Sequence, residues 1–274
     1  MGVDREEFLK LMPFYSVWYK VLFLFVFQFL IFVFAMVFFW WISKSMIIYG
    51  SLIGQFAVSF LGVLPFIYVA AKHDKIRIKY KEKFGNLAAQ KFWLNYQSYS
   101  VSLQAASLYF PLILKTDYFL PAFIVFPPHI LTNSLFPVYI AIPAGIVILA
   151  VGFIISKSFG EFGTDVNDHR FHLIYPDKAE LITTGIYGYI RNPMYLCRGL
   201  ISMGLGVIAN NFLAILVGFI HFIAISSLII PENHELAKRF GQNFYNYKKK
   251  TGSFIPKYGS WMDFIRFVFH KKEK

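Results

Sequence analysis

The amino-acid sequence predicts an all-α, polytopic membrane protein with about six transmembrane helices, the last two forming a tight hairpin, plus a cytosolic C-terminal amphipathic helix. Hydrophobic residues make up 57% of the 274 positions and charged residues only 15%, and the mean hydropathy is +0.53. A soluble domain rarely keeps so large an apolar fraction with so few charges. Apolar runs of about 20 residues, the length that crosses a hydrocarbon core, recur along most of the chain.

The expected spans follow from the length of each apolar run. They are residues 17–42, 47–71, 98–114, 135–156, 193–209 and 212–230. The first span ends at Trp40 and Trp41, which are typical anchors at a membrane interface. The run 194–230 is too long for one crossing, and Asn210-Asn211 divides it into the two helices of the hairpin.

The positions of the basic residues predict the orientation. If both termini are cytosolic, 25 of the 27 Lys and Arg residues lie on the cytosolic side, and only Lys44 and Lys115 lie outside. The positive-inside rule favours this arrangement, so we expect an integral, multi-pass protein with both termini in the cytosol. The net charge of +12 is explained by these clusters beside spans, so no nucleic-acid partner is expected. The basic segment 72–91 is instead suited to anionic lipid head groups.

We divide the chain into two units, in which residues 1–156 hold four spans and residues 157–274 hold a polar segment, the hairpin and the C-terminal tail. The N-terminus lacks the basic-then-apolar pattern of a cleaved signal peptide, so we expect the first span to stay in the mature protein. The single cysteine, Cys197, excludes an internal disulfide and a multi-cysteine metal site. Its apolar surroundings favour a buried, unreactive thiol.

The polar segment 157–193 contains two histidines three residues apart, His169 and His172, with Asp165 and Asp168 nearby. Imidazoles at this spacing can share a helix face and hold zinc. No convincing third ligand accompanies them, and the glycine-rich, proline-bounded context does not predict a helix. We therefore expect ordinary polar loop residues here and no metal site.

The same segment ends in YIRNPMY, which predicts a helix start at the cytosolic boundary. Thr183-Thr184-Gly185 predicts a turn before it, because glycine readily takes positive φ. Asn192 is a preferred N-cap, and Pro193 is favoured in the first turn of a helix. The free N–H groups of that turn, the helix dipole and the charge of Arg191 together suit a carboxylate or phosphate. A capped helix whose arginine only reaches toward the interface explains the residues equally well.

A second polar motif, PENHEL, follows the hairpin. Pro231 can open a helix, and Glu232 in its first turn complements the helix dipole. An apolar stripe then continues along one helix face, at Leu236, Phe240, Phe244 and Tyr247. An amphipathic helix that only binds the interface is the simpler interpretation. Because the hairpin returns the chain to its starting side, it must also bring Glu232 close to YIRNPMY.

The paired motifs LITTGIYGYIRNPMYL and ENHELAKRFGQNFYNYKKKTGSFIP, separated by the hairpin, resemble the isoprenylcysteine carboxyl methyltransferase and phospholipid methyltransferase family of integral membrane enzymes. The resemblance covers residues 179–256. It implies S-adenosylmethionine as cofactor, with Arg191 and Glu232 as catalytic residues. It places the cofactor contacts on Ala179, Glu180, Leu181, Ile182, Tyr187, Asn192, Pro193, Met194, Tyr195 and Glu232.

Some positions depart from the family pattern. Asn192 stands where the family has histidine, so capping and hydrogen bonding remain possible but a titrating imidazole is lost. Asn233 replaces a second glutamate, and Phe244 replaces the first tyrosine of the tail. Leu228 stands where the prenylcysteine enzymes carry an arginine associated with the substrate carboxylate, which weakens the expectation of that acceptor.

The expected activity is therefore methyl transfer to a lipophilic acceptor that enters from the bilayer: a prenylcysteine-like carboxylate, a phospholipid amine or a small thiol. The helix start suits the carboxylate of the cofactor, and Glu232 and tyrosine rings suit its cationic end. The alternative enzyme class is the membrane sterol reductases, which resemble the hairpin region but use a nicotinamide cofactor. The third class is a non-enzymatic transporter or scaffold, for which Gln28, Gln55 and Gln104 offer little mid-membrane polarity.

Overall fold

The computed structural model describes residues 9–10, 12–96, 98–114, 134–163, 174 and 180–269. The regular structure of these residues is helical, and their β-pairing is limited to two isolated bridges, Ser134 with Asn211 and Ile190 with Gly252. The predicted all-α class is therefore confirmed.

Four apolar helical stretches are long enough to cross a membrane: Trp18–Ser43 in α2 (Trp18–Ser45), Tyr49–Val69 in α3 (Ile47–Ala71), Val138–Ser158 in α9 (Val138–Gly163) and Phe212–Phe240. They are typical of a multi-pass membrane protein. Two other predicted spans are shorter. One is α11 (Pro193–Ala209), and the other is α6 (Ser98–Tyr109), which the 3-10 helix η3 (Phe110–Leu114) extends. The total of six crossings stays a prediction.

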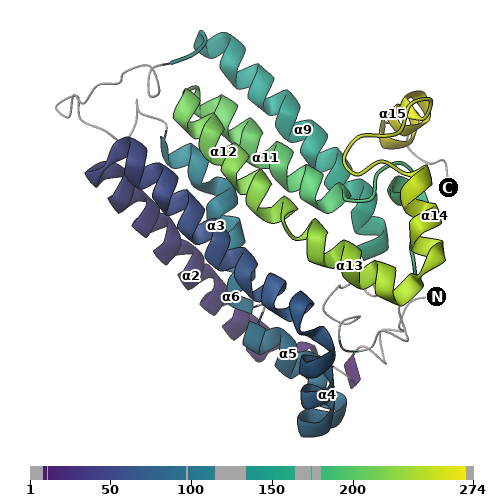
Figure 1. The fold of residues 1–274 in the computed structure, drawn as a ribbon. Coiled ribbons are helices and arrows are strands. Elements are labelled where there is room, and N and C mark those ends of the chain that lie inside the picture. Colours follow the sequence, from purple (N-terminus) through teal and green to yellow (C-terminus); the bar gives the residue numbers. More distant parts are fainter. Residues whose placement is uncertain are drawn as a thin grey trace.

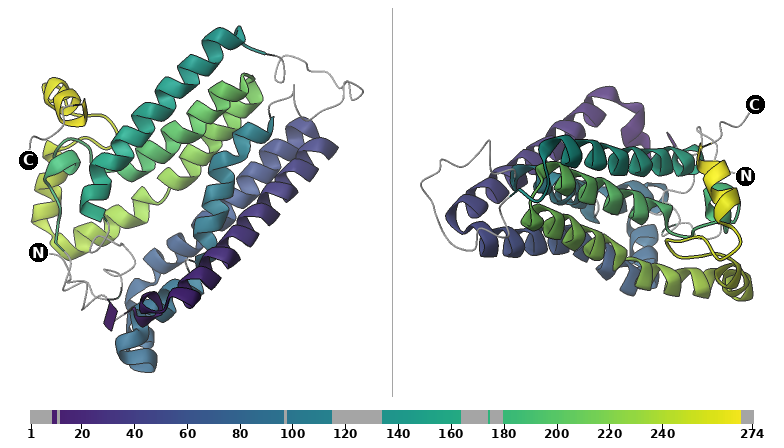
Figure 2. Two further views of the ribbon diagram at one scale, coloured as in Figure 1. Left: turned by 180° about the vertical axis from the view of Figure 1, so that it is seen from behind. Right: turned by 90° about the horizontal axis from the view of Figure 1, so that it is seen from above.

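The bundle has two layers (Figures 1 and 2). One contains α2, α3 and α6, and the other contains α9, α11 and α12 (Phe212–Ser226). Contacts of α3 with α12 and of η3 with α11 join the layers. Large apolar side chains of α2, such as Phe23 and Phe34, lie exposed on the outside, as lipid-facing residues do.

The predicted division at Asn210-Asn211 is confirmed as the turn between α11 and α12. Asn210 takes the left-handed conformation with φ of 61°, which asparagine tolerates. The side-chain oxygen of Asn211 accepts a hydrogen bond of 2.8 Å from the Ala214 N–H and so caps α12. The Asn211 amide also donates to the Leu114 carbonyl, at 2.8 Å, which ties the turn to the end of η3.

Helix α9 packs closely along α11. A Cβ atom added at Gly145 would lie 2.8 Å from the Gly204 carbonyl oxygen, so the two backbones approach too closely for a side chain there. Span four of the sequence prediction is thus a direct neighbour of the hairpin. The division of the chain at residue 156 stays a prediction.

The prediction of one continuous helix in the tail is wrong. Helix α13 (Ile229–Phe240) begins two residues before Pro231, which lies in its first turn, and it ends at Gly241. Gly241 has φ of 52°, a conformation that favours glycine, and α14 (Gln242–Lys250) starts in a new direction after it. The predicted apolar stripe is therefore divided between two helices. The sequence interpretation also missed α15 (Trp261–Phe269).

The tail helices and a second pair of helices leave the bundle at the same end (Figure 1). The predicted basic loop 72–91 is a helical hairpin made of α4 (His73–Phe84) and α5 (Ala88–Tyr96), joined by the 3-10 helix η2 (Gly85–Leu87). Tyr80 and Phe92 pack edge to face in its core, with ring centroids 5.9 Å apart. This end of the molecule carries the predicted functional residues.

Candidate functional site

The hairpin brings the two sequence motifs into contact. Tyr195 lies in the first turn of α11, and Glu232 lies in the first turn of α13. The buried Tyr195 hydroxyl donates a hydrogen bond of 2.9 Å to Glu232 Oε2, although the residues are 37 positions apart. A hydrogen bond to an ionised acceptor is stronger than one between neutral groups. This contact is the centre of the candidate site.

Tyr187 lies beside the same carboxylate. It sits in the 3-10 helix η5 (Gly185–Gly188), which begins at Gly185 with φ of 58°, as the predicted turn requires. Burial raises the pKa of the Tyr187 hydroxyl to about 12, and the negative charge of Glu232 adds to this effect. Tyr187 is therefore neutral at physiological pH. Two protonated tyrosines and one carboxylate thus gather at the start of α11.

Arg191 contacts the tail of the protein. Its Nη1 donates to the carbonyl of Lys248, at 3.0 Å, and to that of Thr251, so it binds the C-terminal end of α14. Cations stabilise this end of a helix because its last carbonyls lack partners within the helix. Burial lowers the pKa of Arg191 below its usual value, but a guanidinium remains protonated at neutral pH. Its predicted catalytic role stays a prediction, whereas its structural role is visible.

The predicted position of Asn192 is confirmed, but the predicted hydrogen bond of its side chain is wrong. Asn192 is the N-cap residue and Pro193 the first residue of α11, yet the Asn192 side chain does not cap the helix. Its Nδ2 donates to Ser253, at 2.8 Å to Oγ and 3.3 Å to the carbonyl, and its backbone N–H donates to the same carbonyl at 3.1 Å. The N–H groups of Met194 and Tyr195 therefore receive no cap from Asn192, and a helix start gives them no partner of its own.

This pairing of 190–192 with 251–253, which we call the tail contact, has a testable energy. We expect Asn192→Ala to lower the free energy of unfolding by about 1 kcal/mol, because it removes the amide bonds to Ser253. Ser253→Ala alone should lower the free energy of unfolding by less. In the double variant it should add little to the effect of Asn192→Ala, because both substitutions remove the same hydrogen bond. Thermal unfolding of the two single variants and the double variant in detergent measures this coupling. Fully additive effects would contradict it.

The remaining predicted contacts lie along the approach to η5 and α11. Glu180 is exposed, Leu181 and Ile182 are half-buried, Pro193 is buried and Met194 is half-buried. Ala179 and the histidine pair His169 and His172 lie outside the described residues. Among the residues that the structure describes, no group of three or more His, Cys, Asp or Glu side chains could hold a metal ion. Cys197 is buried, as predicted.

Sequence reasoning missed the partners that the tail supplies. Tyr247 donates a hydrogen bond of 2.8 Å to the Tyr187 carbonyl, and Ser253 binds Asn192. Burial raises the pKa of Tyr247 above its usual value, so its hydroxyl stays protonated and can donate. In α15, the ring centroids of Phe264 and Phe267 lie 5.9 and 5.5 Å from the ring centroid of Tyr189. The polar TGS triplet at 251–253 was the available signal, but nothing local indicates its partner.

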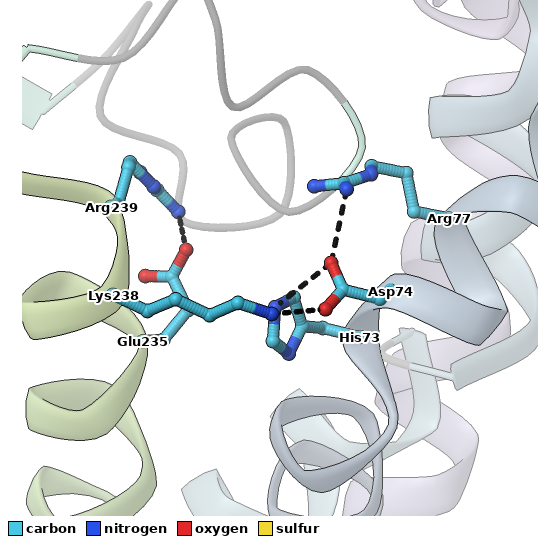
Figure 3. A network of polar contacts seen from close by, with 6 residues as sticks. All are labelled: His73, Asp74, Arg77, Glu235, Lys238 and Arg239. Carbon is cyan, nitrogen blue, oxygen red and sulfur yellow. Dashed lines mark hydrogen bonds and ion pairs between the residues drawn. The ribbon is translucent and has the colours of Figure 1, made fainter.

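A second group of charges joins α13 to α4 (Figure 3). Asp74 binds His73 at 3.2 Å, Arg77 at 3.0 Å and, across the gap between the helices, Lys238. The hydrogen bond from Lys238 is the largest cause that lowers the pKa of Asp74 below its usual value of 3.8. Glu235 and Arg239 pair one turn along α13. The contact between Lys238 and Asp74 thus ties the helix that carries Glu232 to α4.

We expect the pair Asp74–Lys238 to contribute modestly to stability, and in a pH-dependent way. Because the pair is partly exposed, a double-mutant cycle with Asp74→Asn and Lys238→Gln should give a coupling of about 0.2–1 kcal/mol at pH 7. The folded-state pKa of Asp74 lies below its unfolded value, so this contribution is complete above pH 4 and is lost as the pH falls further. Thermal unfolding at pH 7 and pH 3 measures it. The same coupling at both pH values would contradict the assignment.

The fold and this geometry define a class: a multi-pass helical membrane protein with a polar site at one end of a helical hairpin. Residues 138–243 match the model of the family described as phospholipid methyltransferase. The match begins where α9 begins and includes α11, α12 and α13. It therefore contains Tyr187, Tyr195 and Glu232. Residues 138–243 are therefore similar to this family, as the paired motifs predicted.

Three curated relatives match parts of the chain, and two of them are named as methyltransferases. The chain is 27% identical over 133 residues to the protein-S-isoprenylcysteine O-methyltransferase of Schizosaccharomyces pombe, covering 47% of this chain and 54% of the relative. It is 34% identical over 89 residues to the enzyme of that name from Dictyostelium discoideum, covering 31% and 38%. It is also 28% identical over 93 residues to the nickel-cobalt-cadmium resistance protein NccN of Alcaligenes xylosoxydans xylosoxydans, covering 34% and 43%. The matched segments span about half or less of these relatives. No solved structure matches the chain.

Proposed function

We propose that the protein is an S-adenosylmethionine-dependent membrane methyltransferase that acts on a lipophilic acceptor. The observation that carries this proposal is the hydrogen bond between Tyr195 and Glu232, which joins the two motifs across the hairpin within the family segment. A carboxylate held by a buried tyrosine at a membrane boundary offers a fixed negative charge for a cationic ligand. The family match supports a methyl donor as that ligand.

The chemistry of the site fits the two ends of S-adenosylmethionine. Glu232 suits its ammonium, and the faces of Tyr187 and Tyr195 suit its sulfonium. The uncapped N–H groups of Met194 and Tyr195, at the positive end of α11, suit its carboxylate. When bound, the cofactor supplies an electrophilic methyl group. The contribution of the protein is to orient the reactants and exclude water, which can supply much of the rate enhancement.

The acceptor is expected to reach the site from the bilayer. Leu228, which stands where the prenylcysteine enzymes carry an arginine, is buried in an apolar cluster with Val63, Tyr195 and Ile225. This position therefore offers no charge to a substrate carboxylate. Among the acceptors considered, this favours a phospholipid amine or a small thiol over a prenylcysteine-like carboxylate.

The proposed orientation places both termini and the site in the cytosol. Its support is the concentration of basic residues on α4, α13 and α14, at one end of the bundle. Because the native Cys197 is buried, introduced cysteines can report sidedness. An impermeant maleimide should label Ser45→Cys in intact cells and label Thr183→Cys only after permeabilisation. The reverse pattern would rule out a cytosolic cofactor site.

The proposed activity is tested by incubating the purified protein with radiolabelled S-adenosylmethionine and total membrane lipids. We expect label to appear in a lipid fraction, whose head group then identifies the acceptor. Parallel incubations with NADPH and sterols test the reductase alternative. NADPH oxidation that depends on sterol, without any methyl transfer, would replace the proposal with that alternative.

A further inference from the structure

Polar side chains line the interior of the helical bundle below the proposed site. We call them the bundle cluster: Gln55, Ser59, Gln104, Ser107, Arg198 and His221. The two members on α3 are four residues apart and the two on α6 are three apart, so each pair shares one helix face, and α11 and α12 supply one member each. Polar residues inside a membrane bundle are costly and usually mark a functional path.

Ser107 is the centre of the hydrogen bonds. The Gln55 amide nitrogen donates to the Ser107 carbonyl and hydroxyl, both at 3.0 Å, and to the Val217 carbonyl at 3.1 Å. Carbonyls only accept, so these contacts fix the orientation of the Gln55 amide. The Ser107 hydroxyl also lies 2.5 Å from that of Ser59 and 2.9 Å from His221 Nδ1.

We assign the hydroxyl hydrogens so that each partner in this chain has one donor and one acceptor. The Ser59 hydroxyl has Ser107 as its only side-chain partner among the described residues, and we assign Ser59 as the donor in this pair. Ser107 then donates its own hydrogen to His221 Nδ1. A neutral histidine whose Nδ1 accepts carries its hydrogen on Nε2. His221 therefore presents an Nε2–H donor on the far side of its ring.

Two atoms of this network lack a partner within the described part of the chain. His221 Nε2 and Gln55 Oε1 are both buried without a hydrogen bond, and both residues have 0% exposure. A buried polar group left unpaired is destabilising, and neutral donors and acceptors in membrane bundles are normally paired. The side chains of His221 and Gln55 both bond to Ser107, and they leave one donor and one acceptor unpaired. This pair of groups indicates a site for a hydrogen-bonding ligand.

The bundle cluster continues from the proposed methyl-transfer site. Arg198 lies one turn below Tyr195 on α11, donates to Gln104 and interacts electrostatically with both Tyr195 and His221. On α12, His221 lies one turn before Ile225, and Ile225 packs with Tyr195. The four residues from His221 to Ile225 correspond to about 6 Å along the helix axis. His221 thus lies roughly one helical turn further into the bundle than the level of Tyr195.

We propose that the bundle cluster is the subsite for the membrane-embedded part of the acceptor, in which His221 Nε2–H binds a lipid oxygen about one turn below the reacting atom. The ligand class is a lipid with an oxygen at that distance, such as the phosphate or ester of a phospholipid. This inference rests on the proposed function, because it assigns the second substrate of the same site. The enclosure of His221 means that side chains of α3 and α12 must separate to admit the lipid.

Lipid binding to the purified protein, measured by native mass spectrometry, tests the subsite without requiring turnover. The probes are dioleoyl phosphatidylethanolamine and S-farnesylthioacetic acid, used separately to distinguish the two lipid sources. We expect His221→Phe to weaken binding of the phosphatidylethanolamine roughly five- to tenfold, as loss of one buried hydrogen bond does, with unchanged affinity for S-adenosylmethionine. His221→Gln, which keeps an N–H donor, should restore most of the binding.

Two serines provide matched variants. Ser107→Ala should weaken binding of the same probe, because it removes the hydroxyl that sets the orientation of the His221 ring. Ser202→Ala removes a buried serine that donates to the Leu108 carbonyl at 3.1 Å, outside the cluster, and should leave lipid binding unchanged. Equal binding of both probes by the wild type and by the His221 and Ser107 variants overturns the subsite. Lipid binding that depends on His221 without any methyl transfer overturns the proposed function alone.

Discussion

Replacing Glu232 with glutamine is expected to weaken binding of S-adenosylmethionine by roughly 10- to 100-fold while the fold stays intact. The substitution keeps an oxygen that can accept from the Tyr195 hydroxyl at almost the same place. It removes the negative charge, and hydrogen bonds to charged groups contribute about 1.5–3 kcal/mol, which corresponds to this range of affinity. Isothermal titration calorimetry of the purified variant provides the measurement.

The matched control for this prediction is Glu82→Gln, which removes a carboxylate from an exposed position on α4. It changes the net charge by the same amount, so it separates a local effect from a general electrostatic one. The control should bind S-adenosylmethionine like the wild type. Equal affinities of the Glu232 variant and the wild type would remove Glu232 from the site.

Replacing Arg191 with alanine is expected to destabilise the protein by roughly 2–4 kcal/mol, because two charge-assisted hydrogen bonds to the end of α14 are lost. The loss should be concentrated in the tail. Hydrogen exchange should become faster in residues 242–269, whereas α2 and α3 should be protected as before. Weaker cofactor binding should follow, because Tyr247 supports the backbone of Tyr187 from the same tail.

Two variants make the Arg191 prediction specific. Arg191→Lys keeps the charge but loses the forked geometry, so we expect an intermediate loss. Arg266→Ala on α15 removes an exposed arginine, 3.8 Å from Asp263, and should change stability little. If Arg191→Ala abolishes methyl transfer while hydrogen exchange in the tail is unchanged, Arg191 acts directly on the reactants and its structural role is secondary.

The elements that the sequence predicted well are those determined by neighbouring residues. Asn192-Pro193 marks the start of α11, and Asn210-Asn211 marks the turn of the hairpin, because capping, proline geometry and left-handed asparagine are local properties. The approach of Glu232 to Tyr195 was also predictable, because a short hairpin must return the chain to its starting side.

The elements that were predicted wrongly depend on distant partners or on one backbone angle. The amide of Asn192 bonds to Ser253, 61 residues away, in preference to its own helix, and no local pattern indicates that choice. The tail helix ends at Gly241, where the sequence offered a glycine but the apolar stripe continued past it. The bundle cluster was invisible for a similar reason, since serines and a histidine on apolar helices give no sign of which neighbours they face.

The central claim is that a cofactor lies between the start of α11 and the start of α13, and photochemical crosslinking tests it most directly. Purified protein is irradiated with radiolabelled S-adenosylmethionine, with and without excess unlabelled cofactor, and the labelled peptides are mapped by mass spectrometry. The account predicts saturable label in peptides from 180–195 and 229–247, and its loss in Glu232→Gln. Saturable label confined to α2, α3 or the turn at Asn210, or no saturable label at all, would contradict it.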